Sequence, residues 1–445
     1  MQTIKNAVDK HRQLILDTER YIWQNPETGY KEFKTSKYME DTFESLGYDL
    51  VRAEGITGFC ADIDTGKEGP TLLILGELDS IICPAHKDAD PVTGAVHSCG
   101  HNAQCAALVG VAAALKEPGV LDGLCGKIRL CAVPAEELLE IEFRMDLMKQ
   151  GKIKYFGGKT EFMHRGFFDD VDIAFMVHTS VNSFASTLGS VGIIAKNIVY
   201  KGKASHAGGS PHLGRNALYA ATCGLNAVNA IRETLQEQDL IRIHPIITHG
   251  GDMVNAIPET VRLESYTRGR TFDGMVAANK KVNRALTGAA LSLGTNIEIF
   301  DMPGYAPLFN NVDMIGLSKE AFEALDTGLE FHENERVGTG STDMGDISNV
   351  MPALHPYCGG ARGTSHGNDY EIFDPEMACV TCAKWQLAMA KKLLENDAVR
   401  AKEIIANYKA PFASIKEYLA YIDSLNDSGD RIAYSEDGTA QVRFE

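Results

Sequence analysis

The sequence predicts an α/β protein: a mostly parallel sheet with helices on both faces, and a smaller α+β unit inserted into it. Two observations lead to this fold class. Buried strand-like runs alternate with helical stretches over most of the chain, which is typical of parallel sheets covered by helices. From about residue 190 the order changes to β-α-β-β-α-β, that of a ferredoxin-like unit with an antiparallel sheet. The 445 residues are enough for two or three domains.

The first part of the chain supplies the main sheet. In order, we expect helices at 4–24 and 34–47, a strand at 71–79, a helix at 105–117, a strand at 126–137, a helix at 138–150 and a strand at 172–178. Ligands of such sheets gather at the carboxyl ends of the strands. Polar residues stand at these predicted ends, namely Asp79, Glu136, Glu137 and His178.

The insert has its own pattern. An alternating strand begins near 193, and further strands are expected at 241–251, 260–270 and 295–302. Helices are expected at 214–234 and 272–293. A return linker to the main sheet is expected at 302–310. Then α/β character resumes, with a helix at 313–325, a loop to 343, a strand-like run at 351–357 and a helix at 375–395. This division predicts a discontinuous catalytic domain (1–189 and 304–395), an inserted domain (190–303) and a polar C-terminal extension (396–445) with a helical patch at 412–425.

Charge and hydropathy exclude several classes of partner. Sixty acidic residues against 43 basic ones give a net charge of -17, which repels nucleic acid and anionic membrane surfaces. No apolar stretch approaches the length of a membrane span, and the amphipathic start lacks the features of a signal peptide. We therefore expect a cytoplasmic protein that binds neither nucleic acid nor membrane.

The ten cysteines are too few for a disulfide scaffold. Cys379 and Cys382 form a CxxC, but the surrounding sequence has helical periodicity and no second CxxC exists to complete a zinc site. These thiols are expected to be buried as small hydrophobic groups.

Cys99 is the exception, because it lies two residues before His101 in SCGHNAQ, just ahead of an apolar helix. A thiolate and an imidazole on one tight turn suit zinc or another divalent metal that accepts mixed ligands. By itself such a pair is more often a coincidence than a metal site.

Three further segments support a metal site. In PAEE, the consecutive Glu136 and Glu137 diverge, so one can bind metal while the other reaches a metal-bound water as general base. His178 ends a buried strand, and His366 lies in a glycine-rich loop. A solvated acidic loop and a hydrogen-bonded core histidine are the ordinary interpretations of such residues. Together, however, the positions supply one thiolate, three imidazoles and one carboxylate, enough for two metals bridged by water.

With these motifs the chain resembles the dinuclear metallohydrolases of the aminoacylase and carboxypeptidase type. Within that clan it is similar to the amidohydrolase branch that holds auxin-conjugate, hippurate and p-aminobenzoyl-glutamate hydrolases. The resemblance runs from about residue 10 to 395. Its motifs are NPETGYKE, SCGHNAQ, PAEE, the strand that ends in His178, GKASHAGGSPHLGRNAL, GGDMVNAIPE, STDMGDIS and the loop of His366.

The resemblance implies a role for each matching residue. Two divalent metal ions, zinc or manganese, would be bound by Cys99, His101, Glu137, His178 and His366. Glu136 would activate the bridging water. His206 matches a histidine that reaches the active site of a neighbouring subunit, so the resemblance also implies a homodimer formed through the inserted domain. Asn255 and Arg268 match positions that contact the polar end of the substrate; an ordinary strand salt bridge is the alternative for Arg268.

The chain departs from the family pattern at one motif. Many members have CGHDxH, whereas this sequence has Asn102 and Gln104. The missing carboxylate leaves Asp79 as the expected partner that orients a ligand histidine.

The predicted function is hydrolysis of the amide bond of an N-acyl or N-aroyl amino acid, with a metal-bound water activated by Glu136. Two alternatives stay open. One is a dipeptidase or aminopeptidase-like hydrolase of small peptides, which needs a site for a free α-amino group. The other is a catalytically silent binding protein on the same fold.

Overall fold

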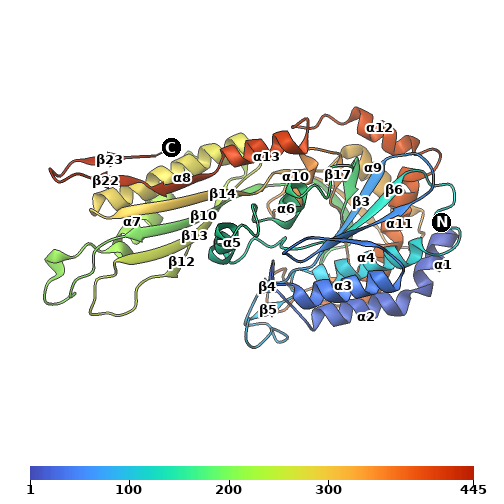
Figure 1. Ribbon diagram of the computed structural model, residues 1–445, viewed down its shortest axis with the longest axis horizontal. Coiled ribbons are helices and arrows are strands. Elements are labelled where there is room, and N and C mark those ends of the chain that lie inside the picture. Colours follow the sequence, from blue (N-terminus) through green and yellow to red (C-terminus); the bar gives the residue numbers. More distant parts are fainter. Residues whose placement is uncertain (445) are drawn as a thin grey trace.

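The computed structural model describes residues 1–444. A broad α/β body carries an elongated second unit at one side (Figure 1). The N-terminus lies on the far side of the body, and the C-terminus lies against the second unit. We call this second unit, residues 192–305, the lid. The predicted fold class, a mostly parallel sheet with an inserted α+β unit, is confirmed.

The main sheet has the strand order β1-β2-β6-β3-β7-β17. Its strands are β1 (Leu50–Arg52), β2 (Phe59–Asp64), β6 (Lys127–Val133), β3 (Thr71–Glu77), β7 (Ile173–Phe175) and β17 (Ala353–Leu354). The four strands from β6 to β17 are parallel, and the other two are antiparallel at one edge. Every residue of β3 is buried, as expected for a central strand covered on both faces.

Helices cover both faces of this sheet. Leu72 and Ile74 of β3 belong to the core on one face, whereas Leu73 and Leu75 belong to the core on the other. The first core includes residues from α1 (Gln2–Lys10), α2 (Arg12–Trp23), α3 (Phe33–Ser45), α4 (His101–Leu115), α9 (Val312–Glu323) and α11 (Cys382–Leu394). The second includes residues from α5 (Ile141–Lys149), α6 (Gly158–His164), α10 (Met344–Ser348) and α13 (Ile415–Ser424). All residues of α4 are buried, so its first turn is fixed rigidly below the site.

Some expectations about local structure are wrong. The helix predicted over 4–24 breaks at His11 into α1 and α2. The strand predicted at 172–178 splits into β7 and β8 (His178–Thr179), which belong to different sheets. Residues expected to form a loop before 343 include β16 (Phe331–Gly338), which is polar and exposed and forms only because it pairs with β9 (Phe184–Ser190). The helix predicted from 375 begins with a π-helical segment, Glu376–Thr381.

A second, smaller sheet and three two-stranded ribbons complete the pairing. The second sheet contains β8, β9, β15 (Leu308–Phe309), β16 and β18 (Tyr357–Cys358). The ribbons pair β4 (Ile81–Ile82) with β5 (Ala95–Val96), β19 (Ala361–Arg362) with β20 (Glu371–Ile372), and β22 (Ile432–Tyr434) with β23 (Ala440–Val442).

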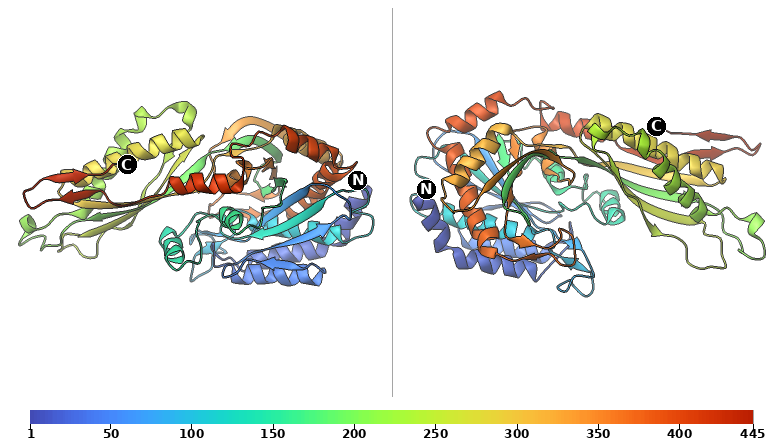
Figure 2. Two further views of the ribbon diagram at one scale, coloured as in Figure 1. Left: turned by 45° about the horizontal axis from the view of Figure 1, so that its top comes forward. Right: turned by 180° about the vertical axis from the view of Figure 1, so that it is seen from behind.

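The lid is an antiparallel sheet with two helices on one face (Figure 2). Its elements are β10 (Gly192–Lys201), α7 (Ala217–Ala230), β11 (Arg242–Ile243), β12 (Ile246–His249), β13 (Thr260–Gly269), α8 (Phe272–Ser292) and β14 (Asn296–Tyr305). Both helices contribute to one core with the sheet. The order β11-β13-β10-β14 puts the first and last strands of the insert side by side, so both connections to the main body leave the lid at one end.

The C-terminal extension contacts both units. After α12 (Val399–Asn407), α13 lies on the main body, where Tyr418 is fully buried and its hydroxyl donates a hydrogen bond to Asp346. Tyr421 contacts Phe272 at the start of α8, with ring centroids 5.0 Å apart. The chain then adds β21 (Asp427–Asp430) to the lid sheet, antiparallel to β14. The polar extension is therefore part of the folded structure.

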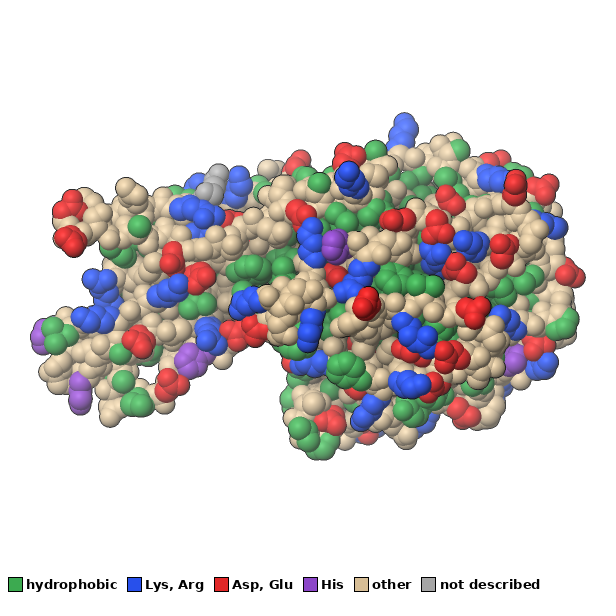
Figure 3. Space-filling view, viewed as in Figure 1, with side chains coloured by type: hydrophobic (Ala, Val, Ile, Leu, Met, Phe, Trp, Pro, Cys, Tyr) green, Lys and Arg blue, Asp and Glu red, His purple; other side chains and the backbone are tan. Residues whose placement is uncertain are grey.

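Charges of both signs are mixed over the face seen in Figure 3, and a notch separates the lid from the main body. Within residues 1–444, no helix combines the length and the apolar character that crossing a bilayer requires.

Candidate metal centre

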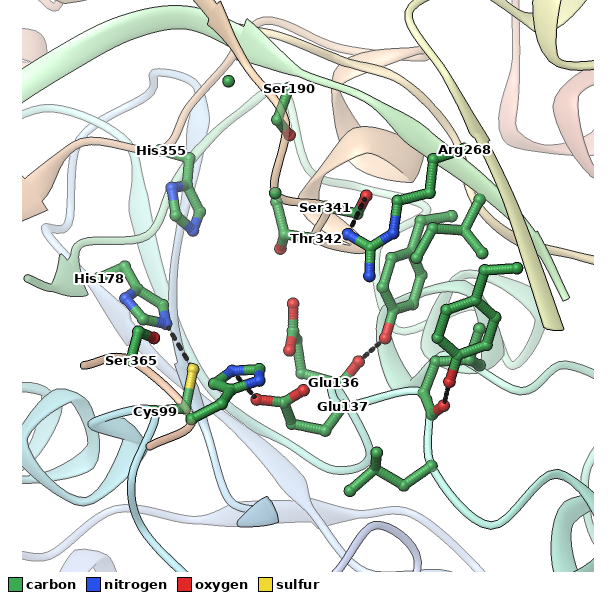
Figure 4. Close-up of a pocket in the computed structure, with 18 of the residues that line it drawn as sticks. Cys99, Glu136, Glu137, His178, Ser190, Arg268, Ser341, Thr342, His355 and Ser365 are labelled. Atoms are coloured by element: carbon green, nitrogen blue, oxygen red, sulfur yellow. Dashed lines mark hydrogen bonds and ion pairs between the residues drawn. The ribbon is translucent and has the colours of Figure 1, made fainter. Parts of the chain in front are cut away.

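A cavity of about 420 Å³ lies where the main body meets the lid. Figure 4 shows that its side chains come from several segments far apart in the sequence and point toward a common centre. Cys99, Glu136, Glu137, His178 and His366 line it from the main body. Ile193, Tyr266, Arg268 and Tyr305 line it from the lid strands.

The turn that carries Cys99 and His101 requires a glycine between them. Gly100 has a φ of 95°, and a Cβ atom there would lie 2.5 Å from the Tyr370 hydroxyl and 2.9 Å from Thr179 Cβ. Only glycine fits this close approach. It reverses the chain so that Cys99 lies outside the first turn of α4 and His101 within it.

Hydrogen bonds set the tautomer of two histidines. His101 Nδ1 lies 2.9 Å from the Asp79 carbonyl, and His178 Nδ1 lies 2.7 Å from the Thr179 carbonyl. Because a carbonyl can only accept, each Nδ1 carries a proton, which leaves Nε2 as the ring nitrogen that a metal would bind. His178 Nε2 lies 3.4 Å from Cys99 Sγ. Both rings are thus oriented as metal-binding histidines usually are.

Asp79 connects His101 with Glu137. Its Oδ2 accepts a hydrogen bond of 2.8 Å from the Glu137 backbone N–H, and its Oδ1 lies 3.3 Å from His101 Nδ1. Asp79 is fully buried and does not line the cavity. These contacts join the His101 ring to the loop that carries Glu137.

The loop after β6 is held by its carbonyl groups. Ala135 has a φ of 55°, which turns the chain sharply at the end of the strand. The next three carbonyls, those of residues 136–138, accept hydrogen bonds from Tyr305 of the lid, Arg144 of α5 and Tyr266 of the lid, respectively. The backbone of the two glutamates is therefore fixed, and two of the three hydrogen bonds that hold it come from the lid.

The two glutamate side chains diverge. Glu137 Oε1 lies 3.1 Å from His366 Nε2, whereas Glu136 Oε2 lies 4.0 Å from His101 Nε2. His366 has a φ of 62°, and its backbone N–H donates to the Ser98 carbonyl at 2.9 Å, which ties the glycine-rich loop to the CGH turn.

Two candidate ligand groups share Cys99. One contains Cys99, His101 and His178, and the other contains Cys99, Glu137 and His366, with donor atoms within 4.8 Å of one another in each. A shared thiolate between two groups suits a pair of metal ions. His101 Nε2 and Glu137 Oε1 are buried and make no hydrogen bond, although a charged group lies 3.1 Å from each. A bound metal ion would give both donor atoms a partner.

The electrostatics favour the deprotonated forms of two candidate ligands. Burial and Glu137 raise the pKa of Cys99, but His101 and His178 outweigh them and lower it to about 6. Burial also raises the pKa of Glu137, but His366 outweighs it and lowers the value to about 2. Glu136 differs: burial and then the charges of Glu77 and Glu137 raise its pKa well above the usual range.

A buried ion cluster, missed by sequence reasoning, lies behind the ligands. The fully buried ammonium group of Lys159 contacts the carboxylates of Glu77 and Asp343. Glu77 Oε2 lies 3.1 Å from His101 Nε2, so the cluster reaches the metal centre. Glu77 is next to a predicted strand end, a weak signal, whereas Lys159 lies in a segment with no motif of its own.

The departures from CGHDxH have local explanations. Asn102 donates a hydrogen bond of 2.8 Å to the buried Glu19 of α2. The Gln104 amide accepts from the Glu77 backbone N–H at 2.6 Å and donates to its carboxylate at 3.1 Å. Both side chains therefore hold neighbouring buried carboxylates in place, and neither lines the cavity.

The three predicted lid residues fall in two places. Arg268 lines the cavity, where its guanidinium contacts Ser341 Oγ at 3.2 Å and His244 Nε2 at 3.1 Å. His206 and Asn255 are exposed and lie outside the cavity. They are neighbours on the lid, because the Ala207 N–H donates to the Asn255 carbonyl at 2.9 Å.

Residues 59–392 match the peptidase family M20/M25/M40. The chain belongs to this family. It is 29% identical to the Xaa-Arg dipeptidase of Homo sapiens over 82% of this chain and 81% of that protein. It is also 29% identical to one of the chains of the p-aminobenzoyl-glutamate hydrolase of Escherichia coli, over 66% of this chain and 59% of that protein.

Among solved structures, the fold resembles that of a Bacillus subtilis protein described as a dinuclear metal binding peptidase from the M20 family. The TM-score is 0.61 and the identity 20%, over 87% of this chain and 99% of that one. Members of the family hydrolyse amide and peptide bonds, so this protein is a hydrolase of carbon–nitrogen amide bonds. The predicted resemblance is confirmed.

Replacing Lys159 with methionine is expected to destabilise the fold by about 3–5 kcal/mol, because Glu77 and Asp343 would stay buried without their cation. The midpoint of urea unfolding measures this change. Lys149→Met is the matched control, since Lys149 pairs with Asp146 but is 71% exposed and should cost less than about 1 kcal/mol. Equal midpoints for the two variants would contradict the importance of the cluster.

Proposed function

We propose that this hydrolase is a two-metal amidohydrolase that releases an amino acid from an N-acyl or N-aroyl amino acid. One observation carries the proposal: a single cavity combines two ligand groups that share a cysteine, a separate carboxylate, and a cation. The carboxylate is Glu136, and the cation is Arg268 of the lid. Two-metal hydrolysis of such an amide would use all three features.

The metals would be zinc or manganese, bound by Cys99, His101, Glu137, His178 and His366 as the resemblance implies. When bound, two divalent ions polarise the amide carbonyl and lower the pKa of the attacking water. Asp79 would keep His101 in the required tautomer.

Glu136 is the proposed general base. It lines the cavity, and its backbone carbonyl is held by Tyr305, so its carboxylate is fixed in position. Burial raises the pKa of Glu136, which makes its ionised form a stronger base towards water. Bound metal ions would favour that ionised form, and the proton it takes can then pass to the leaving amine nitrogen.

Arg268 is proposed to bind the carboxylate of the released amino acid. Its guanidinium faces the cavity beside Ser341, and it can bind a carboxylate through two parallel hydrogen bonds. Leu138, Leu139 and Ile193 supply apolar wall for the acyl or aryl group.

A dipeptidase is the second candidate, because of the similarity to the human Xaa-Arg dipeptidase. That reaction needs an anionic group for a free α-amino group or a basic side chain. Within residues 1–444, the only carboxylates that line the cavity are Glu136 and Glu137, both already assigned. The cavity therefore favours the N-acyl substrate.

We further propose a homodimer formed through the lid, in which His206 and Asn255 enter the partner's cavity. The lid presents both residues to solvent, away from their own cavity. There His206 would help to hold the oxyanion and Asn255 would contact the polar end of the substrate. Each such contact occurs twice in a two-fold dimer.

A cytoplasmic location remains our proposal. All ten cysteines are free thiols, and most of them are buried. A reducing compartment keeps such thiols free. Neither nucleic acid nor a membrane is proposed as a partner.

Hydrolysis of a substrate panel tests the proposed function. We expect release of amino acid from N-acyl amino acids or aminobenzoyl-glutamate, loss of all turnover after chelation, and recovery with zinc or manganese. Mass spectrometry of the products measures this. Exclusive cleavage of dipeptides with a free α-amino group would instead support the dipeptidase, and any turnover excludes a silent binding protein.

The adjacent glutamates should separate catalysis from metal binding. Glu136→Gln should keep two metals per chain but lose most turnover, because base catalysis typically contributes about 10²–10⁴-fold. Glu137→Gln should lose metal as well as turnover. Elemental analysis and steady-state kinetics measure both effects, and metal loss in the Glu136 variant alone would reverse the two roles.

A mixed dimer tests whether His206 acts across the interface. In a dimer of one Glu136→Gln chain and one His206→Ala chain, one site would hold both defects and the other would be intact. Random mixing yields half heterodimers, so about a quarter of all sites should regain full activity. No recovery after subunit exchange, verified by native mass spectrometry, would show that His206 does not act in trans.

A further inference from the structure

His355 lines the cavity but has no role as a metal ligand, general base or carboxylate-binding residue in the proposed function. It follows β17 directly, and its side chain is only 2% exposed. Both ring nitrogens are buried without a hydrogen-bond partner. His355 lines the same cavity as Glu136 and Arg268, and in Figure 4 its imidazole points toward the interior near His178.

The position of the ring is fixed even though its nitrogens are free. The His355 backbone N–H donates to Asn310 Oδ1 at 2.8 Å. The ring stacks on His178 at a centroid distance of 5.6 Å and meets Tyr357 edge-on at 5.1 Å. Packing therefore holds the imidazole in place while its polar edge is left for another partner.

An unpaired buried imidazole costs stability, because the ring has lost its contact with water without gaining a hydrogen bond. A neutral imidazole offers one N–H donor and one acceptor. A partner that enters the cavity can satisfy this group, whereas the described side chains do not.

His97 is a second buried histidine, and it differs from His355 in its position relative to the cavity. Both of its ring nitrogens are also buried and unpaired. His97 does not line the cavity, however, so a substrate there cannot reach it. Among the buried histidines of residues 1–444 with two unpaired nitrogens, only His355 faces the cavity.

We propose that His355 donates a hydrogen bond to the carbonyl oxygen of the amide that is cleaved. This inference rests on the proposed function. His355 lies beside His178, a predicted metal ligand, and so beside the place where the carbonyl would be polarised. The bond strengthens as negative charge develops on the oxygen, which is the stabilisation that an oxyanion site provides.

His355 thus supplies an oxyanion donor from within the same chain. The chain's own His206 lies outside its cavity, so a single subunit would otherwise depend on its partner for a histidine donor. Arg268 is engaged with Ser341 and His244 and is proposed to bind the substrate carboxylate. His355 would then hold the carbonyl of the acyl group and Arg268 the carboxylate of the amino acid, one on each side of the cleaved C–N bond.

The test compares His355→Leu, which removes both ring nitrogens, with His355→Gln, which restores an N–H donor. In the metal-loaded protein, His355→Leu should lower kcat by about 10²–10³-fold, the effect of losing one oxyanion donor. It should weaken binding of a phosphinate analogue of the tetrahedral intermediate by a similar factor, but not binding of the free amino-acid product. His355→Gln should recover part of both losses.

His97→Gln is the matched control, because it changes a buried, unpaired histidine outside the cavity. Metal content per chain and the unfolding midpoint are measured for all variants. Normal kinetics and analogue binding in His355→Leu would overturn the proposal. So would a loss that is explained by missing metal and reversed by adding it, because His355 would then act on the metal centre.

Failure of the proposed function gives a different result. In that case the wild-type protein itself neither hydrolyses an N-acyl amino acid nor binds the phosphinate analogue, and the role of His355 falls with it. If the wild-type protein hydrolyses an N-acyl amino acid and His355→Leu does so equally well, only the role of His355 is contradicted.

Discussion

Five buried carboxylates surround the candidate metal centre, and the ammonium group of Lys159 neutralises part of their charge. The carboxylates belong to Glu77, Asp79, Glu136, Glu137 and Asp343. Lys159 contacts two of them, and His101 and His366 approach the others. Burying this much negative charge is unfavourable unless cations balance it. The centre is therefore built to take up additional positive charge, which is the property that a two-metal hydrolase needs.

The candidate ligands, and the residues that hold them in place, come from separate segments of the chain. Strand ends of a parallel sheet meet at one edge. Asp79 after β3, Glu136 and Glu137 after β6, and His178 after β7 therefore lie close together. Hydrogen bonds to backbone carbonyls then fix the histidine rings, and Asp79 holds one ring and one loop together. Rigid support of this kind keeps metal ligands in place before a metal binds.

The lid takes part in this support. Tyr266 and Tyr305 donate to the carbonyls of Leu138 and Glu136, and Arg268 reaches the same cavity. The C-terminal extension binds the main body through α13 and then completes the edge of the lid sheet with β21. The lid, the loop that carries Glu136 and the C-terminal extension are thus physically connected, so a movement of the lid would also move that loop. His355 adds a donor on the main-body side of the same cavity.

The sequence by itself determined what depends on local pattern. Alternating strands and helices identified the fold class, and short motifs pointed to Cys99, His101, Glu137, His178 and His366, which the fold does bring together. The tertiary structure alone decided what depends on distant partners. Lys159 and His355 have no motif, because an ion pair or an unpaired nitrogen exists only once residues far apart in the sequence meet. For the same reason β16 and β21, which are mostly polar, become strands only through pairing with β9 and β14.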